Sequence, residues 1–88
     1  MQKLAVLLRV LSEPNRLKTL RLLADGPKCV CELKKDLRIP QNLVSHHLRV
    51  LKDANLVQCC PCGKEHHYSN NREELAKLKT SLLAMLPN

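Results

Sequence analysis

Runs of leucine at helical spacing, interrupted once by strand-forming residues, constrain the fold of this 88-residue chain more than any other feature. In the first run, Leu4, Leu7, Leu8 and Leu11 stand at positions i, i+3, i+4 and i+7, which is the spacing of an amphipathic helix. A second helix is expected to follow a cap at Ser12 and to end before the Asp-Gly-Pro segment at 25–27. Further helices are predicted near 31–37, at about 41–54 and after a cap at Asn71.

A different pattern fills residues 56–69. Residues 56–60 and 65–69 are typical of two strands, and the Pro-Cys-Gly-Lys segment at 61–64 is typical of the turn between them. A short extended stretch at 28–30 precedes the third helix. Two short helices joined by a tight turn and followed by a hairpin predict a winged helix-turn-helix. The expected fold is mainly α with a small β-hairpin, with about five helices and a two-stranded wing in a single domain over 1–88.

Charge and composition limit the classes of binding partner that this chain is expected to have. The chain has 15 Lys and Arg against 8 Asp and Glu, a net charge of +7, which favours a polyanionic partner such as nucleic acid. Tyr68 is the only aromatic residue, which argues against recognition of RNA or single strands by base stacking. The sequence shows no targeting segment and no stretch of membrane-spanning length, so we expect a cytoplasmic protein without a membrane partner.

An enzyme is not expected. The chain has only 2 glycines, too few for a glycine-rich phosphate loop, and its nucleophiles, bases and orienting residues form no recognisable arrangement.

The predicted helix at 41–54 has an apolar and a polar face. Val44, His47, Leu48 and Leu51 repeat at helical spacing and are expected to be buried, so His47 should pack rather than contact DNA. The polar face carries no acidic residue before Asp53. In a helix-turn-helix the second helix enters the major groove, where Gln and Asn pair with adenine and Arg pairs with guanine. DNA contacts are therefore predicted from this helix and from the wing, at Gln41, Asn42, Ser45, His46, Arg49 and Lys64.

Three segments carry a resemblance to a known family. L-S-E-P-N-R-L at 11–17, C-V-C-E-L at 29–33 and L-V-S-H-H-L-R-V-L at 43–51 are similar to motifs of the ArsR/SmtB repressors, and residues 56–69 correspond to their wing. The resemblance covers essentially the whole chain. It implies a homodimer, assembled through helices at 1–12 and 72–86, that binds operator DNA and represses genes for metal or metalloid detoxification. An effector would lower its operator affinity.

Five cysteines in a reducing compartment are expected to be thiols or metal ligands rather than disulfides. The resemblance makes Cys29 and Cys31 candidate ligands, although Lys34 stands where the arsenic-sensing pattern has a third cysteine. If residues 28–31 are extended, these two side chains share a face, and pairing of this stretch with the wing brings them toward further cysteines. The candidate metal ligands are Cys29, Cys31, Cys60 and Cys62, with Cys59 as an additional candidate; His66 and His67 are better explained as wing residues.

The effector and its role stay open at this point. Thiolate-rich sites suit Zn²⁺ or Cu(I), and the family adds arsenite, antimonite, Cd²⁺ and Pb²⁺. One alternative is an ArsR-like regulator that responds to redox state through Cys59, Cys60 and Cys62, or to nothing, with Cys29 and Cys31 packed as small apolar residues. Another is a winged-helix interaction module whose wing is stabilised by zinc.

Overall fold

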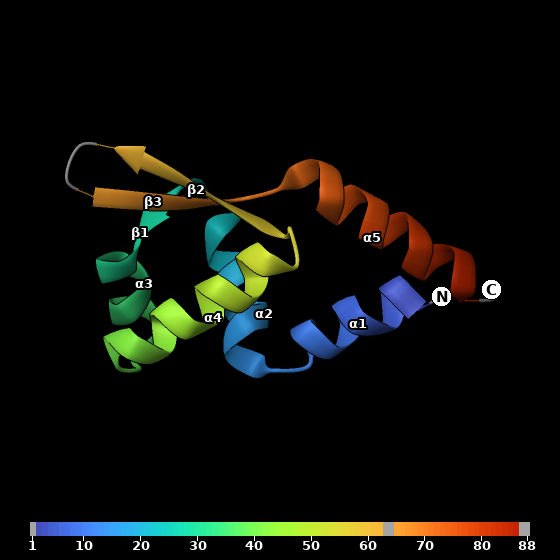
Figure 1. The fold of residues 1–88 in the computed structure, drawn as a ribbon, viewed down its shortest axis with the longest axis horizontal. Helices are drawn as coiled ribbons and strands as arrows, with labels where there is room; N and C mark the ends of the chain where they lie inside the picture. The colour runs from blue at the N-terminus through green and yellow to red at the C-terminus, as the bar shows by residue number, and fades with distance from the viewer. Residues whose placement is uncertain (1, 63–64, 87–88) are drawn as a thin grey trace.

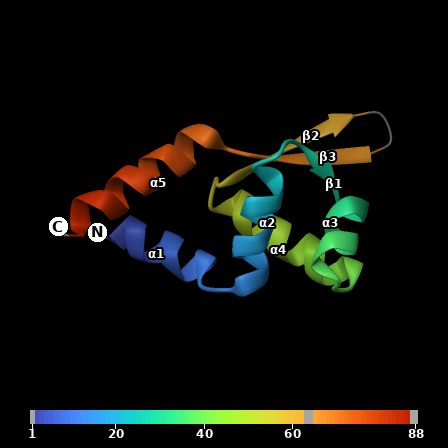
Figure 2. The same cartoon turned by 180° about the vertical axis from the view of Figure 1, so that it is seen from behind.

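The computed structural model describes residues 2–62 and 65–86, without the side chains of Pro61 and Cys62. The described residues form five helices and three strands. The molecule is elongated, with extents of 45 × 23 × 21 Å. In chain order they are α1 (Gln2–Leu11), α2 (Pro14–Leu23), β1 (Lys28–Cys29), α3 (Val30–Leu37), α4 (Gln41–Asp53), β2 (Val57–Cys62), β3 (Glu65–Asn70) and α5 (Arg72–Met85). Figures 1 and 2 show α1 and α5 at one end, together with both termini, and α3 and the sheet at the other.

The sheet is antiparallel, with β3 between β1 and β2. β2 and β3 form the predicted wing hairpin, and β1 extends it to three strands through the pairs Lys28 with Tyr68 and Cys29 with His67. On the other side of β3, Cys59 is opposite Tyr68 and Cys60 is opposite His67. The wing is therefore attached to the start of α3 by the backbone hydrogen bonds of β1.

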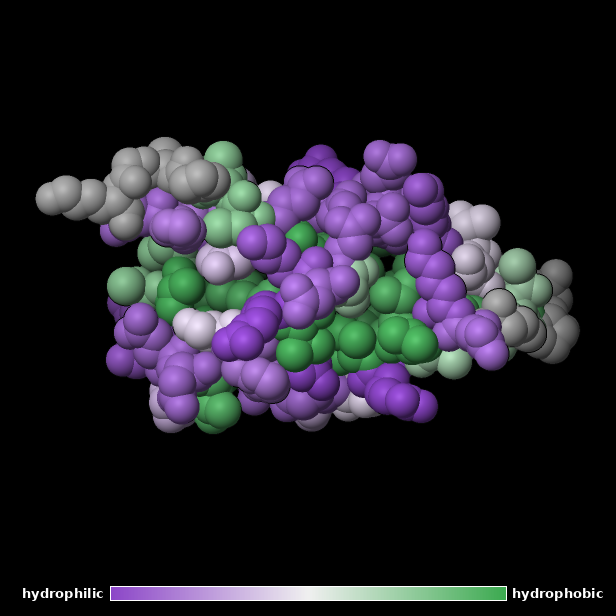
Figure 3. All heavy atoms as spheres, viewed as in Figure 1, coloured by the Kyte–Doolittle hydropathy of each residue, from purple (hydrophilic) through white to green (hydrophobic). Residues whose placement is uncertain are grey.

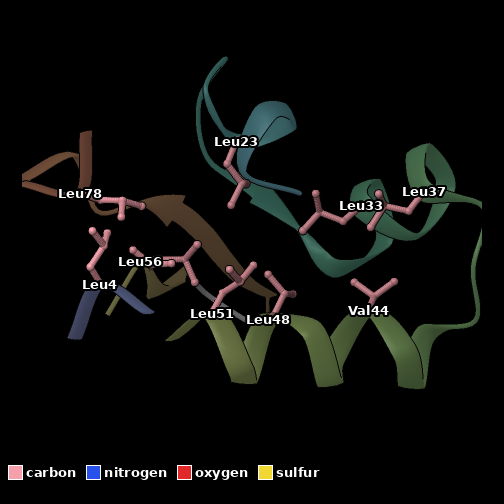
Figure 4. Close-up of a cluster of buried hydrophobic side chains, with 10 residues drawn as sticks. Leu4, Leu23, Leu33, Leu37, Val44, Leu48, Leu51, Leu56 and Leu78 are labelled. Atoms are coloured by element: carbon pink, nitrogen blue, oxygen red, sulfur yellow. The ribbon is translucent and has the colours of Figure 1, made fainter. Parts of the chain in front are cut away.

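One apolar core joins all five helices to the base of the wing. Leu33, Leu48, Leu51 and Leu56 are at most 1% exposed, and Figure 4 shows the side chains of α4 directed toward those of α3 and α2. The predicted buried stripe of α4 is confirmed, since all four of its residues are buried. The full cluster is Leu4, Leu23, Leu33, Leu37, Val44, Leu48, Leu51, Leu56, Val57 and Leu78.

The first residues of each helix have backbone N–H groups without a partner in the helix, and a capping side chain can accept from them. The N-cap of α2 is Glu13, whose carboxylate accepts from the Arg16 N–H at 3.0 Å. The prediction of Ser12 as the cap is wrong, because its hydroxyl donates to the Arg9 carbonyl at 2.7 Å. The prediction of Asn71 as the cap of α5 is confirmed, with Glu74 N–H donating to its side chain at 3.3 Å.

The start of α3 differs from the sequence expectation. Glu32 Oε1 accepts from the Cys29 N–H at 3.2 Å, so Cys29 is the N-cap and the helix begins at Val30. This reciprocal cap ends β1 after two residues. Residues 28–31 are therefore not extended throughout, and the expectation that Cys29 and Cys31 share a strand face is wrong.

No helix within residues 2–62 and 65–86 is long and apolar enough to cross a membrane.

The core assignment predicts that Leu33→Ala lowers the free energy of unfolding by about 2–5 kcal/mol, because it leaves a cavity where α3 packs on α4. Leu17→Ala is a matched control, since Leu17 is a helical leucine that is 50% exposed, and its effect should stay within about 0.5 kcal/mol. Urea unfolding followed by circular dichroism measures both. Equal destabilisation by the two substitutions would contradict this assignment of the core.

Candidate nucleic-acid interface and thiol sites

The exposed face of α4 is polar and carries no negative charge in its first three turns. The five residues of α4 predicted to contact DNA are all exposed: Gln41, Asn42, Ser45, His46 and Arg49. Leu43, Lys52 and Asp53 are exposed on the same helix as well. The buried stripe fixes the rotation of the helix, so this face points away from the core. The first turn contains no acidic residue, and Asp53 lies at the far end. The sixth predicted contact, Lys64, lies outside the described residues.

α3 adds cations beside this face that the sequence reasoning missed. Lys34, Lys35 and Arg38 are exposed, while Leu33 and Leu37 on the same helix are buried. Together with Cys31, Ile39 and Pro40, the three cations surround a shallow hollow that leads to the first residue of α4. The sequence could have predicted the exposure of these cations from their spacing relative to Leu33 and Leu37. Residues between two core leucines on a helix face outward.

The outer face of the sheet brings Cys29, His67 and Cys60 into one row across the three strands. Directly paired residues of antiparallel strands project from the same face, and both cysteines are paired with His67. Cys29 is buried and Cys60 is exposed. Cys29 and Cys60, two of the predicted metal ligands, are therefore both neighbours of the His67 imidazole. His67 was not among the predicted ligands.

The Cys29 thiol is held by Glu32. Its Sγ donates to Glu32 Oε1 at 3.3 Å, beside the backbone bond that caps α3. Hydrogen bonds from the Cys29 N–H and then from its thiol lower the pKa of the Glu32 carboxyl, and the charges of Lys28 and His67 lower it further. The carboxylate therefore stays ionised next to the thiol.

The two ring nitrogens of His67 have different surroundings. Its Nε2 lies 3.9 Å from Glu65 Oε2, and its Nδ1 is buried with no hydrogen-bond partner in the part of the chain that the structure describes. A buried ring nitrogen without a partner is unusual, since most buried polar atoms are hydrogen-bonded.

The other cysteines lie in different surroundings. Cys31 is exposed on α3 and lines the same hollow as Lys34, Lys35 and Arg38. Cys59 faces the opposite side of the sheet from Cys60, and its Sγ is 3.5 Å from His66 Nδ1. Burial, followed by a hydrogen bond with Cys59, raises the pKa of Tyr68. Cys62 pairs with Glu65 in the register, but its side chain is outside the described residues.

Over the described residues, no three His, Cys, Asp or Glu side chains are grouped so that they hold a metal ion together.

An open apolar groove separates α1 from α5. Leu4, Leu7, Leu78 and Met85 line it, with Lys3, Glu73 and Lys77 at its edge. Val6 is 56% and Leu83 is 62% exposed on the same two helices. Figure 3 shows apolar side chains gathered over α1 on the face in view.

Comparisons with known proteins assign the family. A profile described as "Bacterial regulatory protein, arsR family" matches residues 13–58. The chain belongs to the ArsR family. The arsenical resistance operon repressor of Staphylococcus xylosus is 37% identical over 81 residues, which is 92% of this chain and 78% of that protein. The resemblance seen in the sequence motifs is confirmed. This ArsR-family chain is a DNA-binding transcriptional regulator, and the family is one of regulators rather than enzymes.

Two solved structures share the fold of this ArsR-family chain. An ArsR-like transcriptional regulator from Rhodococcus sp. RHA1 superposes with a TM-score of 0.84 at 25% identity, over 96% of this chain and 79% of that one. A homodimeric winged helix-turn-helix DNA-binding domain from Mycobacterium bovis gives a TM-score of 0.79 at 25% identity, over 96% and 78% of the two chains. The predicted winged helix-turn-helix fold is confirmed.

The thiol environments predict unequal reactivity. In the native protein, iodoacetamide should alkylate Cys31 and Cys60 at least about tenfold faster than Cys29, because Cys29 is buried and hydrogen-bonded. Single-cysteine variants followed by mass spectrometry give the three rates. In denaturant the rates should converge. A Cys29 rate equal to that of Cys31 in the native protein would be incompatible with the cap described above.

Proposed function

We propose that this chain is a dimeric transcriptional repressor whose operator affinity is lowered by a thiophilic metal or metalloid ion. The observation that carries the DNA-binding part is the exposed face of α4, which is polar to cationic over three turns and flanked by the cations of α3. A buried stripe on one side and a solvated stripe on the other fix which side chains are available to a groove.

Each side chain on that face has a suitable chemistry. Arg49 can donate two hydrogen bonds to guanine, Gln41 and Asn42 can pair with adenine, and Ser45 and His46 can contact bases or phosphates. Lys34, Lys35 and Arg38 provide phosphate contacts, which add affinity without sequence preference. Lys64 in the wing is proposed as a further backbone contact.

Dimer formation is proposed through α1 and α5, within the segments 1–12 and 72–86. The apolar groove between these helices and the exposed Val6 and Leu83 offer a surface that a second copy would cover. The homodimeric Mycobacterium bovis domain supports this proposal. A two-fold dimer places the two α4 helices in major grooves about one helical turn apart, roughly 34–36 Å.

Arg49→Ala and Lys35→Ala separate base contacts from phosphate contacts. Arg49→Ala should weaken binding to a duplex selected from a randomised library by about 1–3 kcal/mol, with little effect on random DNA. Lys35→Ala should weaken both alike and reduce the salt slope of binding by about 0.9. Fluorescence anisotropy at several salt concentrations measures both effects.

Lys18→Ala serves as the charge-matched control, because Lys18 is an exposed cation on α2, outside both the proposed DNA-contacting helices and the proposed dimer helices. If Arg49→Ala weakens selected and random duplexes equally, α4 does not read sequence in the manner proposed.

The effector part rests on the strand register, which places Cys29, His67 and Cys60 at paired positions of neighbouring strands. Their side chains are not grouped around one point in the described residues, so binding would require them to move together. Two thiols and an imidazole fit the donor preference of arsenite, antimonite, Cd²⁺, Pb²⁺, Cu(I) or Zn²⁺. Cys62, which adjoins this row in the register, is a proposed fourth donor, and Cys31 is a further candidate. A metal ion bound there would take the thiols as thiolates.

Ligation of Cys29 also offers a way to release DNA. A thiol that becomes a metal-bound thiolate no longer donates to Glu32, so the side-chain bond at the start of α3 is lost. α3 is the first helix of the helix-turn-helix and packs on α4 through Leu33 and Leu37. Loosening its first turn therefore acts directly on the DNA-binding unit.

Arsenite, Cd²⁺ and Zn²⁺ titrations test the effector proposal. At least one ion should weaken binding to the selected duplex by about 5–150-fold. Cys29→Ser and Cys60→Ser should abolish that response, and Cys31→Ser is the matched control that keeps it. Loss of the response in Cys31→Ser alone would place the site on α3 instead, and no response to any ion would exclude the sensing proposal.

A thiol-redox response is the second candidate function, favoured by the contact between Cys59 and His66. It predicts that hydrogen peroxide, in place of metal, weakens operator binding and that dithiothreitol restores it. Cys59→Ser would abolish this effect, whereas Cys29→Ser would not.

A further inference from the structure

His47 stands at a junction of three helices. It lies on the buried stripe of α4 and is 8% exposed. Its Nδ1 is 3.4 Å from an amino group of the Arg16 guanidinium, and its Nε2 is 3.6 Å from Glu13 Oε2. Arg16 in turn donates from Nε to the Val10 carbonyl at 2.6 Å. One guanidinium thus connects the last turn of α1 to the middle of α4.

The contacts of His47 determine which ring nitrogen carries the proton. A guanidinium has donors and no acceptor, so Nδ1 must accept and the neutral ring carries its proton on Nε2. That N–H faces the Glu13 carboxylate, at a distance that supports electrostatic attraction rather than a full hydrogen bond. The neutral form of His47 therefore satisfies both of its neighbours.

A second proton would break this arrangement. It would bind at Nδ1, directly against the Arg16 guanidinium, and end the hydrogen bond between Arg16 of α2 and His47 of α4. Burial lowers the pKa of His47; the Glu13 carboxylate raises it, and the charges of Arg16 and His46 lower it. Below the ordinary histidine value of about 6.5, the closed junction therefore binds fewer protons than an open one, and its stability is lost as the pH falls.

We infer that His47 is a positioning residue that fixes the reading helix α4 to the end of the dimer helix α1, and that only its neutral form allows specific operator binding. His47 does not contact DNA in this proposal. It sits one turn from Val44 and Leu51 on the buried stripe, so its contacts with α2 add to the packing that holds Ser45 and Arg49 outward. The inference rests on the proposed reading role of α4.

The sign of the expected pH effect separates this inference from ordinary electrostatics. A protein gains positive charge as the pH falls, and added positive charge strengthens its binding to any DNA. Opening of the His47 junction should weaken binding at lower pH, and it should weaken only the binding to the selected duplex. The preference for a selected duplex over random DNA is therefore the quantity to follow.

The experiment measures that preference by anisotropy from about pH 8 to about pH 5, the range in which histidine changes charge. The duplex is one selected from a randomised library with the wild-type protein at the upper pH. In the wild type the preference should fall by on the order of tenfold over this range, the size of a typical coupling between two sites, as His47 gains its second proton. Circular dichroism and sedimentation on the same samples establish that the protein stays folded and keeps its oligomeric state.

Variants identify the group responsible. His47→Asn keeps an acceptor for Arg16 and cannot titrate, so it should retain the preference at high pH and show no loss at low pH. Glu13→Gln keeps an oxygen to cap α2 but removes the charge that favours protonation, so the loss should move to lower pH. This variant keeps the proposal testable if His47→Asn does not fold. His66→Gln, which replaces an exposed histidine of the wing, should keep the loss.

Two results would overturn the inference: a preference that is constant or rises as the pH falls, or the same loss in His47→Asn as in the wild type. A protein that prefers no duplex at any pH would instead refute the proposed reading role of α4, so the two failures are distinguishable.

Discussion

The packing of α4 on α3 is the interaction on which the rest of the structure depends. Val44, Leu48 and Leu51 are at most 1% exposed and close over Leu33, in a core without tryptophan or phenylalanine. The core has no large aromatic side chain that could hold α4 in another position. The packing of these residues on Leu33 therefore fixes the rotation of α4. The same packing turns the polar face of α4 outward, so the stability of the domain and its ability to present a DNA-reading surface have one physical origin.

Periodicity predicted the elements that depend on this core, because burial dictates which residues of a helix are apolar. The apolar stripe of α4 and the hairpin at 56–69 were visible in the sequence for that reason. Helix ends were predicted less well. Ser12 and Glu13 were both able to cap α2, and the outcome depended on Glu13 also facing His47, a contact between residues far apart in the chain.

The thiol sites were predicted only in part, because they depend on strand register and on competition between local structures. A Cys-Val-Cys segment is able to continue as a strand or to start a helix, and the carboxylate of Glu32 decides for the helix by capping Cys29. His67 was assigned to the wing alone, and its place between Cys29 and Cys60 follows from a register that no local pattern specifies. The cations of α3, by contrast, were readable from their spacing relative to Leu33 and Leu37.

The proposed effector response needs only a small change at the start of α3. Coupling between an effector site and DNA typically amounts to about 1–3 kcal/mol. In that proposal the Cys29 thiol no longer donates to Glu32, whereas the capping bond from the Cys29 N–H to the same oxygen does not involve the thiol. The junction at His47 lies on the other side of the same helix pair, where Arg16 ties α4 to the end of α1. In the two proposals, ligation of Cys29 and the tie from Arg16 to α1 both act on the unit of α3 and α4, so neither effect would have to pass through the whole molecule.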